Sequence, residues 1–436
     1  MTKTHARTAS TSLVLTFVAL VGVANCGGKS LFQLPASFIG GLIILAGPTN
    51  AHATQLIVKP GVYRLDRRTV YAGIEAEPPN DPTIQYYDAK TRRIGTLENI
   101  SGHEYRTNDS PKMTFVLDLP ASPIAEKPFV VEHGPDRLGA SLWHAPGAER
   151  RSTIVLIHGA DDETRAMGFL IPYFVSHGLN VVTYDQRGTG ESTGNWRYTG
   201  PDSKADDIVA ILKKIETDPA VDAHRIGVWG FSNGGWAAPI VTTRFPLAFM
   251  ILKSAPSESI AENVLYEIGQ ALREHDGFNP EQTAHALAFE GTMLFALQTN
   301  SNWRAAGEAL SAAEKQPWFP YMRIPPGMTA PPPAPMLAAL QAALIYDPTT
   351  TLQGVRTPTL AMFGALDKNL DSVDSAARFR KAFNRADLTI VTFPAAGHTL
   401  VKSTTGYEDD PSLPERTVEG YPEVIIRWLD ARDLTK

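Results

Sequence analysis

A serine flanked by glycines follows an apolar run in the middle of the chain. Residues 230–234 have the pattern G-x-S-x-G with Ser232 at the centre, residues 225–229 before them are typical of a strand, and residues 236–243 predict a helix. A strand and a helix that meet at so tight a turn pass close together, so the flanking positions Gly230 and Gly234 must lack bulk. The pattern predicts that Ser232 projects from the turn as a nucleophile.

A serine hydroxyl is a weak nucleophile at neutral pH, so a histidine must take its proton and a carboxylate must hold that histidine in the right tautomer. His398 is the candidate base because it lies in a loop of small residues just after a strand-like run, 388–393. Asp367 is the candidate acid because it follows another such run, 359–363. The alternatives for the acid are Glu258, Asp371 and Asp374.

The elements that must position these residues alternate along the chain. Buried strands are expected at 152–157, 180–184, 225–229, 247–252, 359–363 and 388–393, and helices at 203–216, 236–243, 373–383 and 421–429. A hairpin of 129–132 and 138–143 precedes them. Such alternation predicts an α/β fold, a mostly parallel sheet with helices on both faces and active residues at the carboxyl ends of its strands.

Five motifs follow one another along the chain. They are His158-Gly159 after a strand, Asp185-Gln186-Arg187-Gly188-Thr189-Gly190-Glu191-Ser192, the G-x-S-x-G turn, Gly364-Ala365-Leu366-Asp367, and Gly397-His398. With them, residues 129–433 resemble the α/β-hydrolase superfamily, nearest to its bacterial carboxylesterases and its prolyl-oligopeptidase-like branch. The chain order Ser232, Asp367, His398 is the order of that superfamily's triad. The resemblance also implies an oxyanion hole made by the backbone N–H groups of Ala160 and Asn233.

Two further roles are expected around these motifs. His158 is expected to shape the loop that carries Ala160 rather than to take part in catalysis. Asp185 and Arg187 are expected to form an ion pair that braces their own loop.

The alternation stops between residues 256 and 347, where the superfamily often carries a cap over the active site. This segment predicts helices at 260–273, 280–297, 303–313 and 336–345, with a proline-rich stretch at 325–335. Its aromatic residues either line an apolar acyl pocket or form the core of the cap itself; they are Tyr266, Phe289, Phe295, Trp303, Trp318, Phe319 and Tyr321.

The N-terminal part divides into a leader, 1–53, and a small β-rich domain, 54–127, which precede the hydrolase domain at 128–436. The leader holds basic residues, no acidic one and two short apolar runs. Its A-x-A pattern ending at Ala53 predicts cleavage before Thr54 and a periplasmic or secreted protein. A lipid anchor on Cys26 and a retained N-terminal anchor are the alternatives. In the β-rich domain, strands are expected at 55–58, 69–75, 83–87, 93–97 and 112–117, with a packing role.

Composition narrows the function classes. The 436 residues are 43% hydrophobic and 20% charged, and the formal net charge of −6 comes without a basic patch, which argues against a nucleic-acid partner. A single cysteine leaves neither a disulfide framework nor a cysteine-based metal site. We expect no metal and no cofactor, a small-molecule ester as partner, and membrane contact only through the leader or a lipid anchor; the oligomeric state has no signal in the sequence.

The sequence therefore predicts a serine hydrolase that cleaves carboxylic esters through an acyl-enzyme intermediate. An exported serine aminopeptidase and an acyl thioesterase would use the same machinery. The aminopeptidase needs a carboxylate for the substrate's amino group, and the cap supplies Glu262, Glu267, Glu274 and Glu290 as candidates. A non-catalytic binding protein on this scaffold is the alternative from another class, and it is disfavoured because no triad member is missing.

Overall fold

The computed structural model describes residues 59–65, 68–75, 83–108, 112–117, 120–147, 149–160, 162–275, 277–383, 387–407 and 415–435. The expected leader, its cleavage site at Ala53, the lipid-anchor alternative at Cys26 and the strand expected at 55–58 all lie outside these residues. Within the described ranges no helix combines the length and the apolar character needed to cross a bilayer.

The larger sheet carries the motifs. In spatial order its eight strands are β15 (Leu388–Phe393), β14 (Thr359–Gly364), β13 (Phe249–Lys253), β12 (Val221–Phe231), β10 (Arg151–Ile157), β11 (Asn180–Tyr184), β9 (Asp136–His144) and β8 (Ala125–His133). The six strands from β15 to β11 run parallel, while β9 and β8 are antiparallel to their neighbours. This is the expected α/β fold, with β10 and β12 side by side at its centre.

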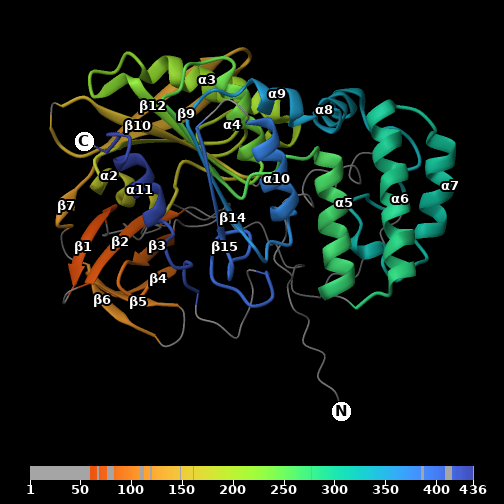
Figure 1. Cartoon of the computed structure of the whole chain (residues 1–436), viewed down its shortest axis with the longest axis horizontal. Coiled ribbons are helices and arrows are strands. Elements are labelled where there is room, and N and C mark those ends of the chain that lie inside the picture. The colour runs from red at the N-terminus through yellow and green to blue at the C-terminus, as the bar shows by residue number, and fades with distance from the viewer. Residues whose placement is uncertain are drawn as a thin grey trace, which may run out of the picture.

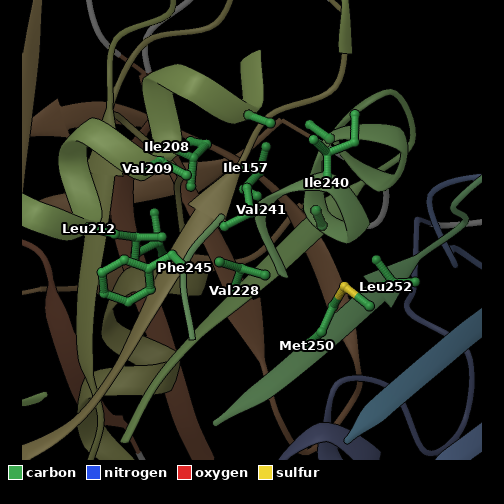
Figure 2. Close-up of a cluster of buried hydrophobic side chains, with 14 of the residues drawn as sticks. Ile157, Ile208, Val209, Leu212, Val228, Ile240, Val241, Phe245, Met250 and Leu252 are labelled. Carbon is green, nitrogen blue, oxygen red and sulfur yellow. The ribbon is translucent and has the colours of Figure 1, made fainter. Parts of the chain in front are cut away.

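Helices cover both faces of this sheet because side chains alternate along each buried strand. Val155, Ile157 and Val228 point to one face, where they pack under α3 (Pro201–Ile215), α4 (Gly234–Thr242), α9 (Pro348–Gly354) and α10 (Ser372–Ala382). Figure 2 shows this cluster, with side chains of α3 and α4 meeting those of the strands. Ile154 and Trp229 point to the other face, under α2 (Leu170–Ser176) and α11 (Glu423–Asp430).

The N-terminal residues form a second, antiparallel sheet. Its order is β6 (Thr114–Val116), β5 (Glu104–Thr107), β4 (Arg93–Ser101), β3 (Thr83–Asp88), β2 (Arg68–Glu75), β1 (Gly61–Leu65) and β7 (Ser122–Pro123). One face has its own apolar core. The other packs on α2, where the ring centroids of Tyr71 and Tyr173, and those of Tyr87 and Phe169, lie 5.1 Å apart. Aromatic contacts therefore attach this sheet firmly to the hydrolase domain.

The insertion after β13 is a helical cap, as expected. It comprises α5 (Ile260–Gln270), α6 (Pro280–Thr299), α7 (Trp303–Ala313) and α8 (Ala334–Leu344), which share a separate apolar core. In Figure 1 these helices extend from one side of the larger sheet and the N-terminal sheet lies on the other. Of the cap aromatics, Phe289, Trp318 and Phe319 are buried in the cap core, whereas Phe295 and Tyr321 are exposed.

Candidate active site

Ser232 lies at the end of β12, immediately before α4, in a left-handed backbone conformation with φ 51°. A non-glycine residue in this region stores about 1–3 kcal/mol of strain, which the surrounding structure must hold. Two hydrogen bonds hold it: the Ser232 N–H donates to the Lys253 carbonyl at 3.0 Å, and the Gly235 N–H donates to the Ser232 carbonyl at 2.7 Å. The side chain is consequently fixed at the apex of the turn.

Three glycines make this turn possible. A Cβ on Gly230 would lie 2.7 Å from the Gly234 carbonyl oxygen, and one on Gly234 would lie 2.7 Å from the carbonyl oxygens of Ile157 and His158. The distance at Gly230 confirms that the strand and the helix pass too closely for a side chain, whereas Gly234 is crowded by the end of β10 rather than by the strand of the turn. Gly235 adds a requirement that sequence reasoning missed, since its Cβ would lie 2.2 Å from the Cβ of Ala255.

The structure brings Ser232, His398 and Asp367 together. His398 Nε2 lies 2.8 Å from Ser232 Oγ, and His398 Nδ1 lies 2.9 Å from Asp367 Oδ2. All three residues are buried. An imidazole bonded at Nδ1 to a carboxylate leaves Nε2 as the proton acceptor, which is the arrangement needed to activate a hydroxyl group.

Hydrogen bonds also constrain the chain around Asp367 and His398. The Oδ1 atom of Asp367 accepts the N–H groups of Asn369 at 2.8 Å and Leu370 at 3.1 Å, so the carboxylate cannot rotate freely. Ser254, at φ 47°, donates its hydroxyl to the His398 carbonyl at 2.6 Å. Sequence reasoning missed Ser254, although it directly follows β13 at the same sheet edge.

Glu258, the alternative acid, has other partners. One of its carboxylate oxygens accepts from the Asn263 side chain at 3.1 Å, and the other accepts from Ser375 Oγ at 2.9 Å. Burial raises the pKa of this carboxyl, against the effect of those hydrogen bonds. Asp371 and Asp374, the remaining alternatives, belong to α10: Asp371 caps its first turn and Asp374 pairs with Arg378.

The segment that carries Ala160 lies directly beside the start of α4. Gly234 is in contact with the Ile157 and His158 carbonyls, and Asn233 is the residue that precedes the helix. The N-terminus of a helix favours negative charge because its first N–H groups have no partner within the helix. Ala160 and Asn233 thus belong to the two segments that meet at the start of α4.

A buried network fixes the loop before Ala160. His158 Nε2 donates to the Tyr184 carbonyl at 2.7 Å, and its Nδ1 lies 2.9 Å from Glu163 Oε2. Lys204, from α3, donates its ammonium group to the Gly159 carbonyl at 2.5 Å. Desolvation opposes ionisation of Glu163, but His158 and Lys204 outweigh it and lower the pKa of that carboxyl. His158 therefore shapes this loop, and Lys204 was not foreseen.

The expected ion pair between Asp185 and Arg187 does not form. Asp185 instead accepts two hydrogen bonds from the Arg165 guanidinium, and Arg187 pairs with Asp136 and Asp207. Each of the two residues therefore has its ionic partner on another segment of the chain. The loop is braced as expected, but by ion pairs to residues outside the loop rather than by one pair within it.

Helix α5 of the cap contacts the loop that carries Asp367. The Asn263 side chain donates to the Asn369 carbonyl at 2.8 Å, and the Tyr266 hydroxyl donates to the Asp367 carbonyl at 3.3 Å. Lys368 forms an ion pair with Glu274 just beyond the helix. The cap is therefore anchored beside the reacting groups.

Two of the four cap glutamates are buried around one arginine. The Arg323 guanidinium lies 3.3 Å from Glu267 Oε2, and the Arg323 backbone N–H donates to Glu290 Oε2 at 3.3 Å. Glu267 Oε1, Glu290 Oε1 and Arg323 Nε are buried without a hydrogen-bond partner. The other two, Glu262 and Glu274, pair at the surface with Arg378 and Lys368.

Burial raises the pKa of Glu290 to about 7 and outweighs the opposing effect of Arg323. A folded-state pKa above the unfolded value means that Glu290 adds stability at acidic pH, which is lost as the pH rises through about 7. The glutamine of Glu290→Gln is neutral at every pH. We expect the free energy of unfolding of this variant, relative to that of wild type, to rise by about 3 kcal/mol from about pH 5 to about pH 8. Thermal unfolding at both pH values measures this.

Glu281→Gln is the control for this change, because Glu281 is exposed on the same helix. If the free energy of unfolding depended equally on pH in wild type and in Glu290→Gln, the raised pKa of Glu290 would be contradicted.

In the part of the chain that the structure describes, no group of three or more histidine, cysteine, aspartate or glutamate side chains is arranged to hold a metal ion.

Comparison with known proteins supplies the family context. A model of the alpha/beta hydrolase family matches residues 154–409, more than half of the chain, and the matched range includes Ser232, Asp367 and His398. An uncharacterised 31.7 kDa protein of Escherichia coli is 32% identical over 93 residues, which are 20% of this chain and 32% of that protein. A bifunctional esterase/perhydrolase of Acinetobacter calcoaceticus is 27% identical over 113 residues, which are 25% of this chain and 37% of that protein.

The chain thus spans about a third of the length of these curated relatives. Among solved structures, an esterase of Pyrococcus furiosus aligns with 13% identity and a TM-score of 0.43, over 71% of this chain and 91% of that one.

Proposed function

Because the chain belongs to the alpha/beta hydrolase family, we propose that it is a serine hydrolase that cleaves carboxylic esters through an acyl-enzyme intermediate. The observation that carries the proposal is the continuous hydrogen-bonded path from Ser232 Oγ through His398 to Asp367, with contacts of 2.8 and 2.9 Å. The expected partner is a small-molecule ester, and the expected export of the protein remains part of the proposal.

In the proposed first half-reaction, His398 Nε2 takes the proton of Ser232 Oγ as that oxygen attacks the ester carbonyl. Asp367 stabilises the imidazolium that forms and keeps Nδ1 protonated. The carbonyl oxygen becomes an oxyanion, to which the backbone N–H groups of Ala160 and Asn233 would donate. Collapse of this intermediate breaks the bond to the alcohol, which leaves with the proton from His398.

In the second half-reaction, water attacks the acyl-serine. His398 accepts one proton from that water, the acyl group departs as a carboxylic acid, and the proton returns to Ser232 Oγ. No group outside the triad and the backbone donors is needed, so the proposal requires no redox or cofactor step.

A serine aminopeptidase is the second candidate, supported by the buried cap glutamates. Glu267 is in electrostatic reach of the triad: burial raises its pKa most, while the charges of Arg323 and His398 lower it. Its unpartnered Oε1 and that of Glu290 have the chemistry to accept a substrate ammonium group. Against this candidate, Arg323 already supplies a positive charge between them.

The test is a comparison of substrates with the purified chain from Thr54 onward. One series consists of p-nitrophenyl esters of increasing acyl length, the second of aminoacyl p-nitroanilides, and the third of acyl thioesters. We expect turnover of the esters, and a fluorophosphonate probe should label Ser232. Selective anilide turnover would favour the aminopeptidase and selective thioester turnover a thioesterase. The absence of all turnover and labelling would contradict the proposal and leave a binding protein.

A further inference from the structure

A cleft separates the N-terminal sheet from the larger sheet. It consists of a cavity of about 450 Å³ and a second of about 490 Å³, which share Glu75, Gln85, Ile94, Thr399 and Val401 as lining residues. The two cavities therefore adjoin each other along these residues. Each volume is in the range of small-molecule binding sites.

The cleft is lined by chain neighbours of Ser232 and His398 and by the loop after Ala160. Phe231 directly precedes Ser232 and lines the first cavity, and its ring lies 5.3 Å from that of His398. Thr399, directly after His398, lines both cavities, and Glu163 lines the first from the loop after Ala160. A substrate with its carbonyl at Ser232 would therefore have the cleft beside it.

Strands of the N-terminal sheet form the opposite wall. Glu75, Gln85 and Ile94 come from β2, β3 and β4. This wall is fixed to the loop after Ala160 by the Gly168 N–H, which donates to the Ile74 carbonyl at 3.1 Å. It is fixed to the segment after His398 by the Ile94 N–H, which donates to the Glu415 carbonyl at 3.3 Å.

These backbone contacts bind the wall to both sides of the candidate active site. The wall and the loop after Ala160 lie so close together that a Cβ on Gly73 would be 1.9 Å from the Gly168 carbonyl oxygen. The wall is thus held in one position, and preorganised walls favour selective binding because less order must be imposed when the ligand arrives.

The lining combines apolar and acidic groups. Ile94, Phe231 and Val401 supply apolar surface. The carboxylates facing the cleft are Glu75, Asp162, Glu163 and Glu415, whereas the only lysine or arginine among the lining residues that the structure describes is Lys253. Lys253 directs its ammonium group onto the Phe231 ring, 4.4 Å from the centroid. Glu163 is paired with His158, but carboxylates still outnumber cations in the lining, so the cleft disfavours anions and suits groups that donate hydrogen bonds.

We propose that this cleft binds the part of the substrate remote from the scissile bond, and that the N-terminal sheet selects extended esters whose remote part is neutral or cationic. The proposal rests on the proposed esterase function and names its substrate class. It gives the N-terminal sheet a role in specificity, in addition to the packing role expected from the sequence.

The test fills the cleft and compares small with extended substrates. Ile94→Trp places an indole where both cavities meet, and Ile100→Trp is the matched control, since Ile100 is on the same strand but 44% exposed. One substrate series extends the acyl chain from p-nitrophenyl acetate, and the other extends the alcohol from methyl acetate. One methylene in a hydrophobic pocket changes kcat/KM by about 10- to 200-fold, so a substrate that loses the pocket should lose at least tenfold.

We expect Ile94→Trp to lower kcat/KM at least tenfold for the longest members of one series, while both acetates stay within twofold of wild type. The series that responds identifies the part of the ester that enters the cleft. Ile100→Trp should match wild type throughout. Unchanged kcat/KM for extended esters would overturn the proposal, as would an equal loss for acetates and extended esters in a folded variant.

A substitute variant and a comparison of charged chain ends extend the test. Thr96→Trp, which fills the second cavity alone, replaces Ile94→Trp if the latter fails to fold. In the responding series, matched chains ending in methyl, trimethylammonium or carboxylate should show the carboxylate as the poorest substrate, and equal rates would overturn the charge preference. Acetate turnover by wild type is the internal reference, because its absence would count against the esterase function rather than the cleft.

Discussion

Replacing Ser232 with alanine should abolish ester turnover, with kcat falling by about 10⁶-fold, as in other triads that lose their nucleophile. The change removes the hydroxyl oxygen that lies 2.8 Å from His398 Nε2, so no acyl-enzyme can form. The backbone should tolerate it, because alanine accepts φ 51° at about the same cost as serine. Rates with p-nitrophenyl acetate and labelling by fluorophosphonate measure the effect.

Ser311→Ala is the control for this substitution, since Ser311 is an exposed cap residue whose hydroxyl donates only within its own helix, to the Gly307 carbonyl. It should retain wild-type rates. Turnover by a folded Ser232→Ala variant would refute the proposed mechanism.

Replacing Asp367 with asparagine should lower kcat by about 10⁴-fold with little change in KM. The Oδ1 atom of Asp367 accepts two backbone N–H groups, which an amide oxygen would continue to do. The amide nitrogen must then face His398 Nδ1. A nitrogen that donates to Nδ1 forces the proton onto Nε2, so the ring can no longer accept the proton of Ser232. Steady-state kinetics near neutral pH measure the loss.

The alternative acids supply matched controls. Asp374→Asn, on the neighbouring helix α10, and Glu258→Gln should keep rates within a few-fold of wild type in a folded protein. A 10⁴-fold loss in Glu258→Gln with normal activity in Asp367→Asn would move the acid to Glu258.

Much of the fold followed from patterns that physical chemistry makes specific. Buried parallel strands leave continuous apolar runs, so β10, β12 and β14 were predicted within a few residues. The glycines at 230 and 234 predicted the turn because no other residue fits there. Short elements such as α2 and β5 were missed, since few residues of helical or alternating pattern distinguish them from loops.

The buried charged residues were predicted less well, although their spacing along the apolar faces of helices indicated burial. Lys204 is four residues before Ile208 and seven before Ile211, on the apolar face of α3, so a lysine there must enter the interior. Glu290 holds a corresponding position between Ala286 and Met293 on α6. Their partners could not be predicted, because the contacts join segments far apart in the chain.

The long separation between the reacting groups has a consequence for the synthesis of the protein. Ser232 and His398 are 166 residues apart, and β14 and β15, which position Asp367 and His398, follow the cap in the chain. A growing chain can therefore complete the turn of Ser232 while its base has not yet been made. Non-local strand pairing must finish before the hydroxyl of Ser232 gains its neighbour His398. Under the proposed mechanism, hydrolytic competence therefore arrives only with the folded sheet, and a partly synthesised chain carries an inert serine.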